Sequence, residues 1–256
     1  MRLKIEGMSD NFSDLKRKVY DSVGRQRYVT EMFDQLAPRY DRFNRLVSFS
    51  QDEKWRLKAL DLLGECGKGV VLDLAAGTGD LARSALRNGA RHVQVFDISY
   101  EMLRLAKGKL AGVAENGGMV HFQRGSADQL PFSDGTLDAV ASGFAMRNVF
   151  HFLDDVLAEI FRVLRPGGRF AILELSQPRN FFLRTGFALH LKTIMPLIGK
   201  MTAGASSPFS YLGNTALTFL KPEEFAQRLT AAGFSEVAWQ PFMLGGICIH
   251  TGLKVK

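Results

Sequence analysis

The sequence predicts an α/β fold with a mostly parallel, seven-stranded sheet, an antiparallel last strand and helices on both faces. Between residues 70 and 175, short apolar runs alternate with helical patterns, which is the order of β and α units in a parallel sheet. A small-residue loop with two glycines separates the first strand from the next helix. Near the end of the chain, two strands are joined by so short a link that they must be antiparallel.

The segment before the sheet is predicted to contain a tail and two helices. Residues 1–24 are polar and charged, and we expect a loosely ordered tail there. Residues 25–64 form a helical cap. In its first helix, apolar residues recur at spacings of three and four from Phe33 to Tyr40, and its second helix covers Trp55–Leu63. A glycine-containing stretch ends the second helix.

The repeating part of the chain is expected to contain five strands with helices between them. The predicted strands are Val70–Leu74, His92–Asp97, Val120–Arg124, Leu137–Gly143 and Arg169–Leu175. The predicted helices are Asp80–Asn88, a helix that Ser99 caps and that runs to Leu110, and Asp154–Val163. A turn at Pro166–Gly168 precedes the fifth strand.

The C-terminal part departs from this alternation. A basic amphipathic helix covers 180–195 and is interrupted near Pro196. A helix at Lys221–Ala232 follows, and then the two closing strands at Glu236–Pro241 and Ile247–Lys254.

Composition limits the classes of protein. The 256 residues, 46% of them hydrophobic, are enough for one globular domain with a core. No apolar run approaches the ~20 residues of a membrane span, and the polar N-terminus lacks the apolar core of a secretory signal, so we expect a cytoplasmic protein. Two distant cysteines predict neither a zinc site nor a disulfide framework. The net charge of +7 fits either an anionic partner or simple solubility.

The glycine loop and the next strand predict a nucleotide-type site. Gly77 and Gly79 remove side chains where a ligand must approach the backbone. The third glycine position of a dinucleotide-binding loop is Ala82 here, so that pattern is only partly met. Asp97 ends the next strand, 20 residues after Gly77, where a carboxylate can accept hydrogen bonds from two ribose hydroxyls.

Four motifs resemble those of class I S-adenosylmethionine-dependent methyltransferases: DLAAGTGD at 73–80, FDIS at 96–99, GSADQLPF at 125–132 and LRPGGRF at 164–170. The resemblance implies a Rossmann-like fold that binds S-adenosylmethionine and releases S-adenosylhomocysteine. It also implies the contacts of each residue: Asp73 with the methionine amino group, Gly77, Thr78 and Gly79 with its backbone, Asp97 with the ribose, Ser126 and Ala127 with the adenine, and Gly143 at the end of the fourth strand.

Longer segments resemble the ubiquinone/menaquinone biosynthesis C-methyltransferases: FDQLAPRYDRFNRLVSF at 33–49, ASGFAMRNV at 141–149, LELSQP at 173–178 and GGICIHTGLK at 245–254. The resemblance covers residues 27–256. It implies that 25–256 form a methyltransferase domain, with a substrate- and membrane-facing insertion at 179–220. The implied reaction is methylation of a ring carbon of a polyprenylated quinol, either demethylmenaquinol or a benzoquinol. A sulfonium methyl is already electrophilic, so no metal is required.

Three residues are candidates for the chemistry on the quinol. Arg147 and Asn148 follow the fourth strand, and we expect Arg147 to favour the quinolate and Asn148 to orient a ring oxygen. Tyr211 would be a second polar wall. The alternative for Arg147 is a surface ion pair with Asp154 or Asp155. We expect His250 to be a core residue because it lies too deep in its strand, and His151 falls where the family pattern has no histidine.

The sequence also suggests partners. Leu183, Phe187, Leu191, Ile194 and Ile198 would share one helical face, with Arg184 and Lys192 off it, and this face could bind an anionic membrane peripherally. A nucleic-acid substrate is not expected, since no Asn-Pro-Pro-aromatic element follows the fourth strand. The sequence allows a homo-oligomer. A small-molecule O- or N-methyltransferase and a non-catalytic S-adenosylmethionine-binding protein remain alternatives.

Overall fold

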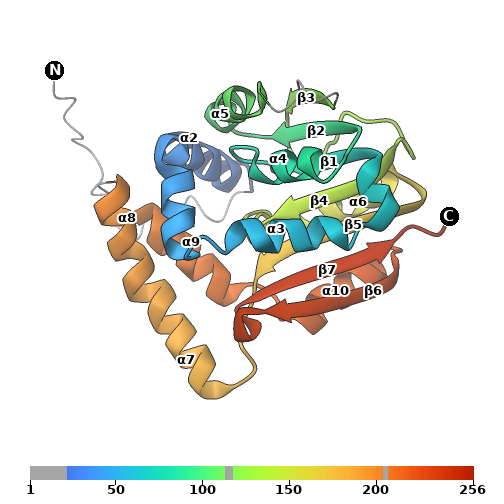
Figure 1. Cartoon of the computed structure of the whole chain (residues 1–256). Coiled ribbons are helices and arrows are strands. Elements are labelled where there is room, and N and C mark those ends of the chain that lie inside the picture. The colour runs from blue at the N-terminus through green and yellow to red at the C-terminus, as the bar shows by residue number, and fades with distance from the viewer. Residues whose placement is uncertain (1–21, 113–117, 204–206) are drawn as a thin grey trace.

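A computed structural model describes residues 22–112, 118–203 and 207–256, and within these ranges seven strands form one sheet (Figure 1). The strand order is β3-β2-β1-β4-β5-β7-β6. The strands are β1 Val70–Leu74, β2 His92–Asp97, β3 Met119–Arg124, β4 Leu137–Gly143, β5 Leu164–Leu175, β6 Ser235–Phe242 and β7 Ile247–Leu253. Neighbours from β3 to β5 are parallel, and β7 is antiparallel to both β5 and β6. The predicted mixed sheet is confirmed.

Helices cover both faces of the sheet. They are α2 Ser22–Val47, α3 Asp52–Asp61, α4 Asp80–Arg87, α5 Tyr100–Leu110, α6 Leu153–Val163, α7 Phe181–Leu189, α8 Met195–Ala203, α9 Ser207–Thr218 and α10 Pro222–Ala231. Side chains alternate between the two faces along each strand, so Val71 packs with α3, α4 and α5, and Leu72 packs with α6 and α10. Residues 1–21 of the tail expected at 1–24 lie outside the described residues. The last three residues of that range belong to α2, which begins at Ser22.

A third apolar cluster lies beyond the end of the strands. It joins α2, α8, α9 and the turn between α7 and α8 through buried side chains that include Leu36, Phe43, Leu191 and Phe209. Leu175, the last residue of β5, packs against this cluster, so the helices stand over the carboxyl ends of the parallel strands. Figure 1 shows this helical layer to the left of the sheet. Ligands of open α/β sheets bind at this edge.

Two predicted details are wrong in instructive ways. The turn expected at Pro166–Gly168 is instead a bulged part of β5, because Gly167 takes a φ of 75° and its N–H pairs with the carbonyl of Lys254 at 2.6 Å. The helix expected to break near Pro196 continues as α8 after a π-helical turn at His190–Ile194. A proline lacks an N–H and clashes with the preceding turn, and the wider π turn directly before it relieves both problems.

The π turn also changes which face of α7 and α8 is apolar. An extra residue in one turn rotates everything that follows, so the five residues expected on one face are divided. Leu191 is 2% exposed and points inward, whereas Ile194 is 46% exposed. Seven apolar side chains of this segment are exposed, and we call five of them the outer strip: Phe182, Leu189, Ile194, Leu197 and Met201. None of the helices in the described ranges has the length and apolarity that a bilayer span needs.

Candidate active site

The glycine loop after β1 is built by backbone conformations that favour glycine. Gly77 and Gly79 have φ values of 55° and 79°. A Cβ at Gly79 would lie 3.0 Å from the Cβ of Ala106 on α5, so this position also needs glycine for packing. The loop therefore presents bare backbone to the cleft at the end of β1.

Asp73 presents an unpartnered oxygen to this cleft. Its Oδ2 accepts a hydrogen bond from the N–H of Ala82 at 2.8 Å, while its buried Oδ1 has no partner among the described residues. Burial raises the pKa of Asp73 to about 7. Asp73 lines a small pocket together with the glycine loop, Thr78 and Gly143. A buried carboxylate oxygen without a partner fits a bound ammonium group.

Asp97 lies on the other side of the loop and accepts hydrogen bonds from two backbone N–H groups. Its Oδ2 accepts the N–H of Gly77 at 2.7 Å, and its Oδ1 accepts the N–H of Ser99 at 2.8 Å. Burial raises the pKa of Asp97, although the hydrogen bonds from these two N–H groups lower it. Each carboxylate oxygen can still accept one further bond. Asp97 can therefore hold two hydroxyls while fixing the glycine loop and the start of α5.

Asp97 lines a second pocket with Ser126 and Ala127. The Ser126 hydroxyl donates to Asp128 and accepts from Gln26 Nε2 at 2.5 Å, so the side chain is already engaged. Asn148 also lines this pocket, as does His151. The structure thus places Asn148 beside the predicted adenine site and away from Arg147's cavity.

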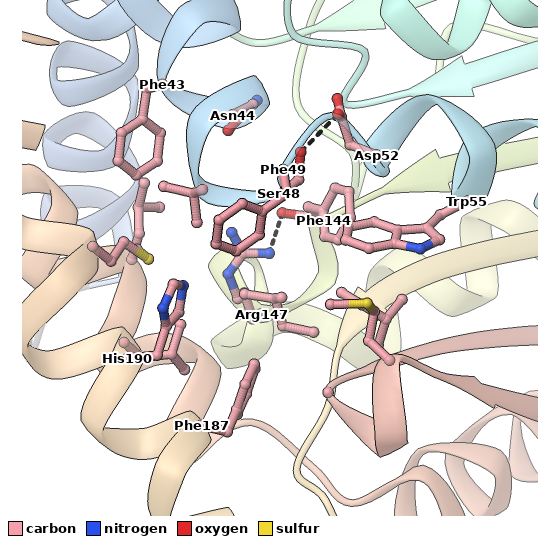
Figure 2. A pocket seen from close by; sticks show the side chains of 18 of the residues that line it. Phe43, Asn44, Ser48, Phe49, Asp52, Trp55, Phe144, Arg147, Phe187 and His190 are labelled. Carbon is pink, nitrogen blue, oxygen red and sulfur yellow. Dashed lines mark hydrogen bonds between the residues drawn. The ribbon is translucent and has the colours of Figure 1, made fainter. Parts of the chain in front are cut away.

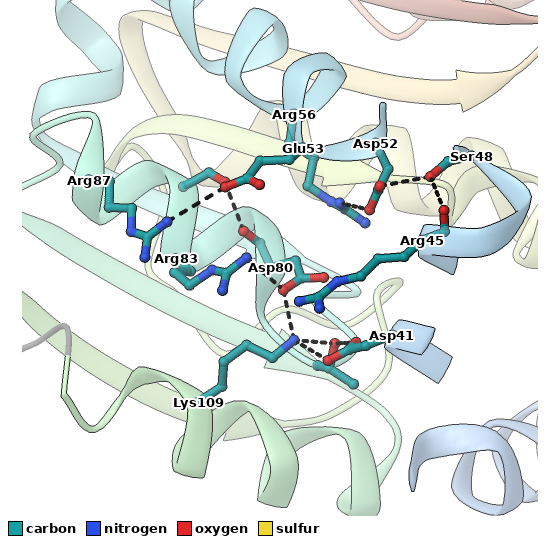
Figure 3. Close-up of polar contacts among 12 residues, drawn as sticks. Asp41, Arg45, Ser48, Asp52, Glu53, Arg56, Asp80, Arg83, Arg87 and Lys109 are labelled. Atoms are coloured by element: carbon teal, nitrogen blue, oxygen red, sulfur yellow. Dashed lines mark hydrogen bonds and ion pairs between the residues drawn. The ribbon is translucent and has the colours of Figure 1, made fainter. Parts of the chain in front are cut away.

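Helix α2 is tied to the glycine loop by charged groups (Figure 3). Asp41 accepts from the Thr78 hydroxyl at 2.5 Å and pairs with Lys109 Nζ at 2.6 Å. Lys109 also pairs with Asp80 at 2.7 Å. Two turns earlier on α2, Asp34 accepts a hydrogen bond from the Ser99 hydroxyl. Two carboxylates seven residues apart share a helix face, a signal that could have revealed this contact from sequence.

A larger, mostly apolar cavity adjoins the Asp73 pocket (Figure 2). Its volume is about 230 Å³. Four residues line both spaces: Tyr40, Asn44, Arg56 and Phe144. Its apolar walls include Phe43, Trp55, Phe187 and Leu212. An apolar ligand in this cavity would lie next to the end of the cleft where Asp73 lies.

Phe144 shapes the boundary between the two spaces. It follows β4 with a φ of 62°, a strained conformation for a bulky residue, and its ring meets Trp55 edge-on at 6.4 Å between centroids. Such strain gathers at functional sites. Its carbonyl accepts from Arg147 at 2.5 Å, which helps to aim the guanidinium (Figure 2).

Arg147 lines the apolar cavity and is 5% exposed. It pairs with the buried carboxylate of Glu174 at 2.5 Å, and its backbone N–H bonds to the same carboxylate at 3.2 Å. The surface ion pair with Asp154 or Asp155 considered for Arg147 is therefore wrong, because Arg147 is buried against Glu174 and Asp154 pairs with Arg228. Sequence reasoning missed Glu174, although an acidic residue in an otherwise apolar strand signals a cationic partner.

The other candidate residues lie outside this cavity. Tyr211 packs edge-on against Tyr28 at 5.9 Å, and its buried hydroxyl has no hydrogen-bond partner among the described residues. His250 is buried, its Nε2 lies 3.0 Å from the carbonyl of Pro222, and burial lowers its pKa to about 4. His250 is the core residue that was predicted. Sequence reasoning missed His190, which lines the cavity from the π turn.

Comparison with known proteins decides the family. A model of the ubiE/COQ5 methyltransferase family matches residues 21–254. The chain belongs to this family. It is 38% identical to "Ubiquinone/menaquinone biosynthesis C-methyltransferase UbiE" of Desulfotalea psychrophila, over 88% of this chain and 90% of the relative. It is 37% identical to a "Demethylmenaquinone methyltransferase" of Symbiobacterium thermophilum, over 90% of this chain and 94% of the relative.

A solved structure supports the fold of this family member. A protein of Thermotoga maritima, described as a SAM-dependent methyltransferase and possible histamine N-methyltransferase, superposes with a TM-score of 0.59. It is 19% identical, and the match covers 88% of this chain and 99% of that one. The predicted Rossmann-like class I methyltransferase fold is confirmed. Within the described residues, no group of three or more His, Cys, Asp or Glu side chains is placed to hold a metal ion.

Proposed function

We propose that this protein transfers a methyl group from S-adenosylmethionine to a ring carbon of a polyprenylated quinol. The observation that carries the proposal is the apolar cavity that shares Tyr40 and Phe144 with the Asp73 pocket. A cavity of about 150 Å³ holds benzene. The 230 Å³ here therefore suits a substituted ring, and the relatives' printed names point to quinone biosynthesis.

The cofactor would supply an electrophilic methyl group on a sulfonium. The unpartnered Oδ1 of Asp73 would accept hydrogen bonds from its ammonium group. Asp97 would accept from the ribose hydroxyls, and the pocket at Ser126 and Ala127 would take the adenine. Gly77, Thr78, Gly79 and Gly143 would surround the methionine end. The apolar cavity then excludes water and aligns the ring with the methyl group.

Arg147 is the candidate for stabilising the quinolate. A phenol-like hydroxyl has a pKa near 10, and a cation beside it favours loss of its proton. The Glu174 carboxylate offsets part of that charge but holds the guanidinium at the cavity wall. The placement of Asn148 and Tyr211 outside the cavity gives no support to a contact with the ring.

The prenyl tail must extend beyond a cavity of this size, and the outer strip would receive it at a membrane. Phe182 and Met201 are 81% and 80% exposed, and Leu244, which follows the cavity residue Met243, is 76% exposed. Exposed cations, Arg184 and Lys192, flank these residues. Apolar anchors next to cations bind anionic bilayers peripherally. We propose such a contact in place of the face inferred from sequence.

The test is methyl transfer with purified protein, S-adenosylmethionine, and short-chain demethylated naphthoquinol or benzoquinol. Mass spectrometry should find one added methylene, and fragmentation should place it on ring carbon. The comparison of the two substrates assigns the quinone nucleus. Transfer to oxygen, or to neither quinol, contradicts the proposal. Flotation with anionic and neutral vesicles tests the membrane contact separately, and equal binding to both contradicts it.

A further inference from the structure

The π turn between α7 and α8 places one histidine in the wall of the apolar cavity. His190 is the first residue of this turn, and Figure 2 shows its ring pointing into the cavity from the side opposite Trp55. The imidazole has no hydrogen-bond partner among the residues that the structure describes. π turns inside helices occur frequently at functional sites.

The other titratable groups of the cavity are unsuited to accept a proton. Asp52 accepts from Arg56 at 2.5 Å and from Ser48 at 2.8 Å, so its carboxylate is engaged. Burial raises the pKa of Tyr40, which keeps its phenol protonated near neutral pH. The guanidinium of Arg147 carries only N–H donors and is bound to Glu174 and to the carbonyl of Phe144, so it offers no lone pair to accept a proton.

We propose that His190 is the catalytic residue that takes the proton from the quinol hydroxyl. The inference rests on the proposed function. It assigns Arg147 an electrostatic role and gives proton transfer to a different element of the structure, the α7–α8 turn. The reaction needs such an acceptor because methylation at carbon releases one proton overall.

The hydroxyl proton passes to a ring nitrogen of His190, and its electron pair moves into the ring. The ring carbon forms a bond to the methyl group as the methyl–sulfur bond breaks, and that bond's electron pair stays on sulfur. The ring carbon then loses its hydrogen as a proton while the ring oxygen regains one, which restores the quinol. One proton remains on His190 and leaves to solvent.

The charge state of His190 suits this role. Burial lowers the pKa of the imidazole below its ordinary value of 6.5, so the free base predominates at neutral pH. The groups that could influence its titration from the cavity are Tyr40, Asp52, Arg56 and Arg147, and from its own helices Arg184, Lys192 and Lys200. Helix α9, which packs against the turn, carries no charged side chain over its described length.

The test compares His190→Gln and His190→Ala with His121→Gln, a matched control on the exposed part of β3. With short-chain demethylmenaquinol or benzoquinol, whichever wild type methylates, single-turnover transfer should fall by ~10²- to 10⁴-fold in both His190 variants. Affinity for S-adenosylhomocysteine should stay at the wild-type value. The wild-type rate should fall as the pH drops through the histidine pKa, and His190→Gln should lack this dependence. Added imidazole should partly restore His190→Ala.

The outcomes separate this inference from the proposed function. If wild type methylates a quinol and His190→Gln matches its rate, this inference alone fails. A slow variant with the wild-type pH profile and no imidazole rescue assigns His190 a structural role and also overturns it. If wild type methylates no quinol, both fail. Should the variants not fold, the pH titration of the His190 ring is followed by NMR in wild type. It must change when an oxidised naphthoquinone or benzoquinone is bound, and an unchanged titration refutes the contact between His190 and the ring.

Discussion

Replacing Asp73 by asparagine should stabilise the folded chain at alkaline pH while weakening cofactor binding. The asparagine amide has nearly the shape of the carboxyl group. Its oxygen can accept from the N–H of Ala82, as Oδ2 of Asp73 does at 2.8 Å, which leaves its NH2 in the position of the unpartnered Oδ1. The substitution therefore removes a buried charge with little change in packing.

The size of the effect follows from the pKa of this carboxyl group. Burial raises it from 3.8 to about 7, and at ~1.36 kcal/mol for each tenfold change in acidity this makes the buried carboxylate about 4 kcal/mol less favourable than in the unfolded chain. The folded pKa lies above the unfolded one, so the folded chain binds the proton more tightly. Stability is present at low pH and is lost as the pH rises through about 7.

When the pH is raised from 5 to 8, wild type should lose about 2.5 kcal/mol of unfolding free energy relative to Asp73→Asn. Urea denaturation of the cofactor-free proteins at several pH values measures it. A lost charge-assisted bond costs ~1.5–3 kcal/mol, so S-adenosylhomocysteine should bind about 10- to 100-fold more weakly to the variant. Wild-type affinity should also fall below pH 7 as Asp73 is protonated. Parallel stability curves, or an unchanged affinity in calorimetry, would refute the reasoning.

Four further variants probe the other parts of the site and the outer strip. Asp97→Ala should cost ~2–4 kcal/mol of S-adenosylhomocysteine affinity, and wild-type affinity in calorimetry contradicts this. It should also cost ~1–3 kcal/mol of unfolding free energy, because two backbone N–H groups lose their acceptor. Arg147→Ala should lower quinol turnover by ~100-fold and stability by ~3–5 kcal/mol, since Glu174 is left buried without its cation. Replacing both partners by leucine should restore stability but not turnover. Phe182→Ser combined with Met201→Ser should reduce flotation with anionic vesicles at unchanged turnover of a water-soluble quinol, and equal flotation counts against the outer strip.

Much of the sheet and the placement of the candidate site residues could be predicted from sequence because local signals determine them. The bounds of β1, β2 and β4 match the predicted strands. Ser99 caps α5 as expected, with its hydroxyl accepting the N–H of Met102 at 3.1 Å. Asp73 and Asp97 meet at one edge because each belongs to the C-terminal half of a parallel strand. The pairing of β1 with β2 then brings both residues to the same loop.

The parts that could not be predicted depend on contacts between distant segments or on irregular backbone. Glu174 reaches Arg147 only through the packing of β5 against the segment after β4. The apolar face of α7 and α8 was inferred from a period of 3.6 residues, and one π turn is enough to turn Ile194 outward while Leu191 stays buried. The same irregular turn brings His190 into the cavity, where no motif pointed.

The candidate cofactor site and the apolar cavity are built from different parts of the chain. The carboxylates and glycines that suit the cofactor come from the sheet and its first loop, as in any protein of this fold. The apolar cavity is completed mainly by α2, α3 and the helices after β5, through residues such as Phe43 and Leu212. Helix α2 contributes to both, since Asp41 accepts a hydrogen bond from Thr78 in the glycine loop, and Tyr40, its neighbour in sequence, lines the apolar cavity. Substitutions of cavity residues that do not touch the glycine loop, such as Phe43 and Leu212, should therefore alter the choice of substrate and leave the donor unchanged.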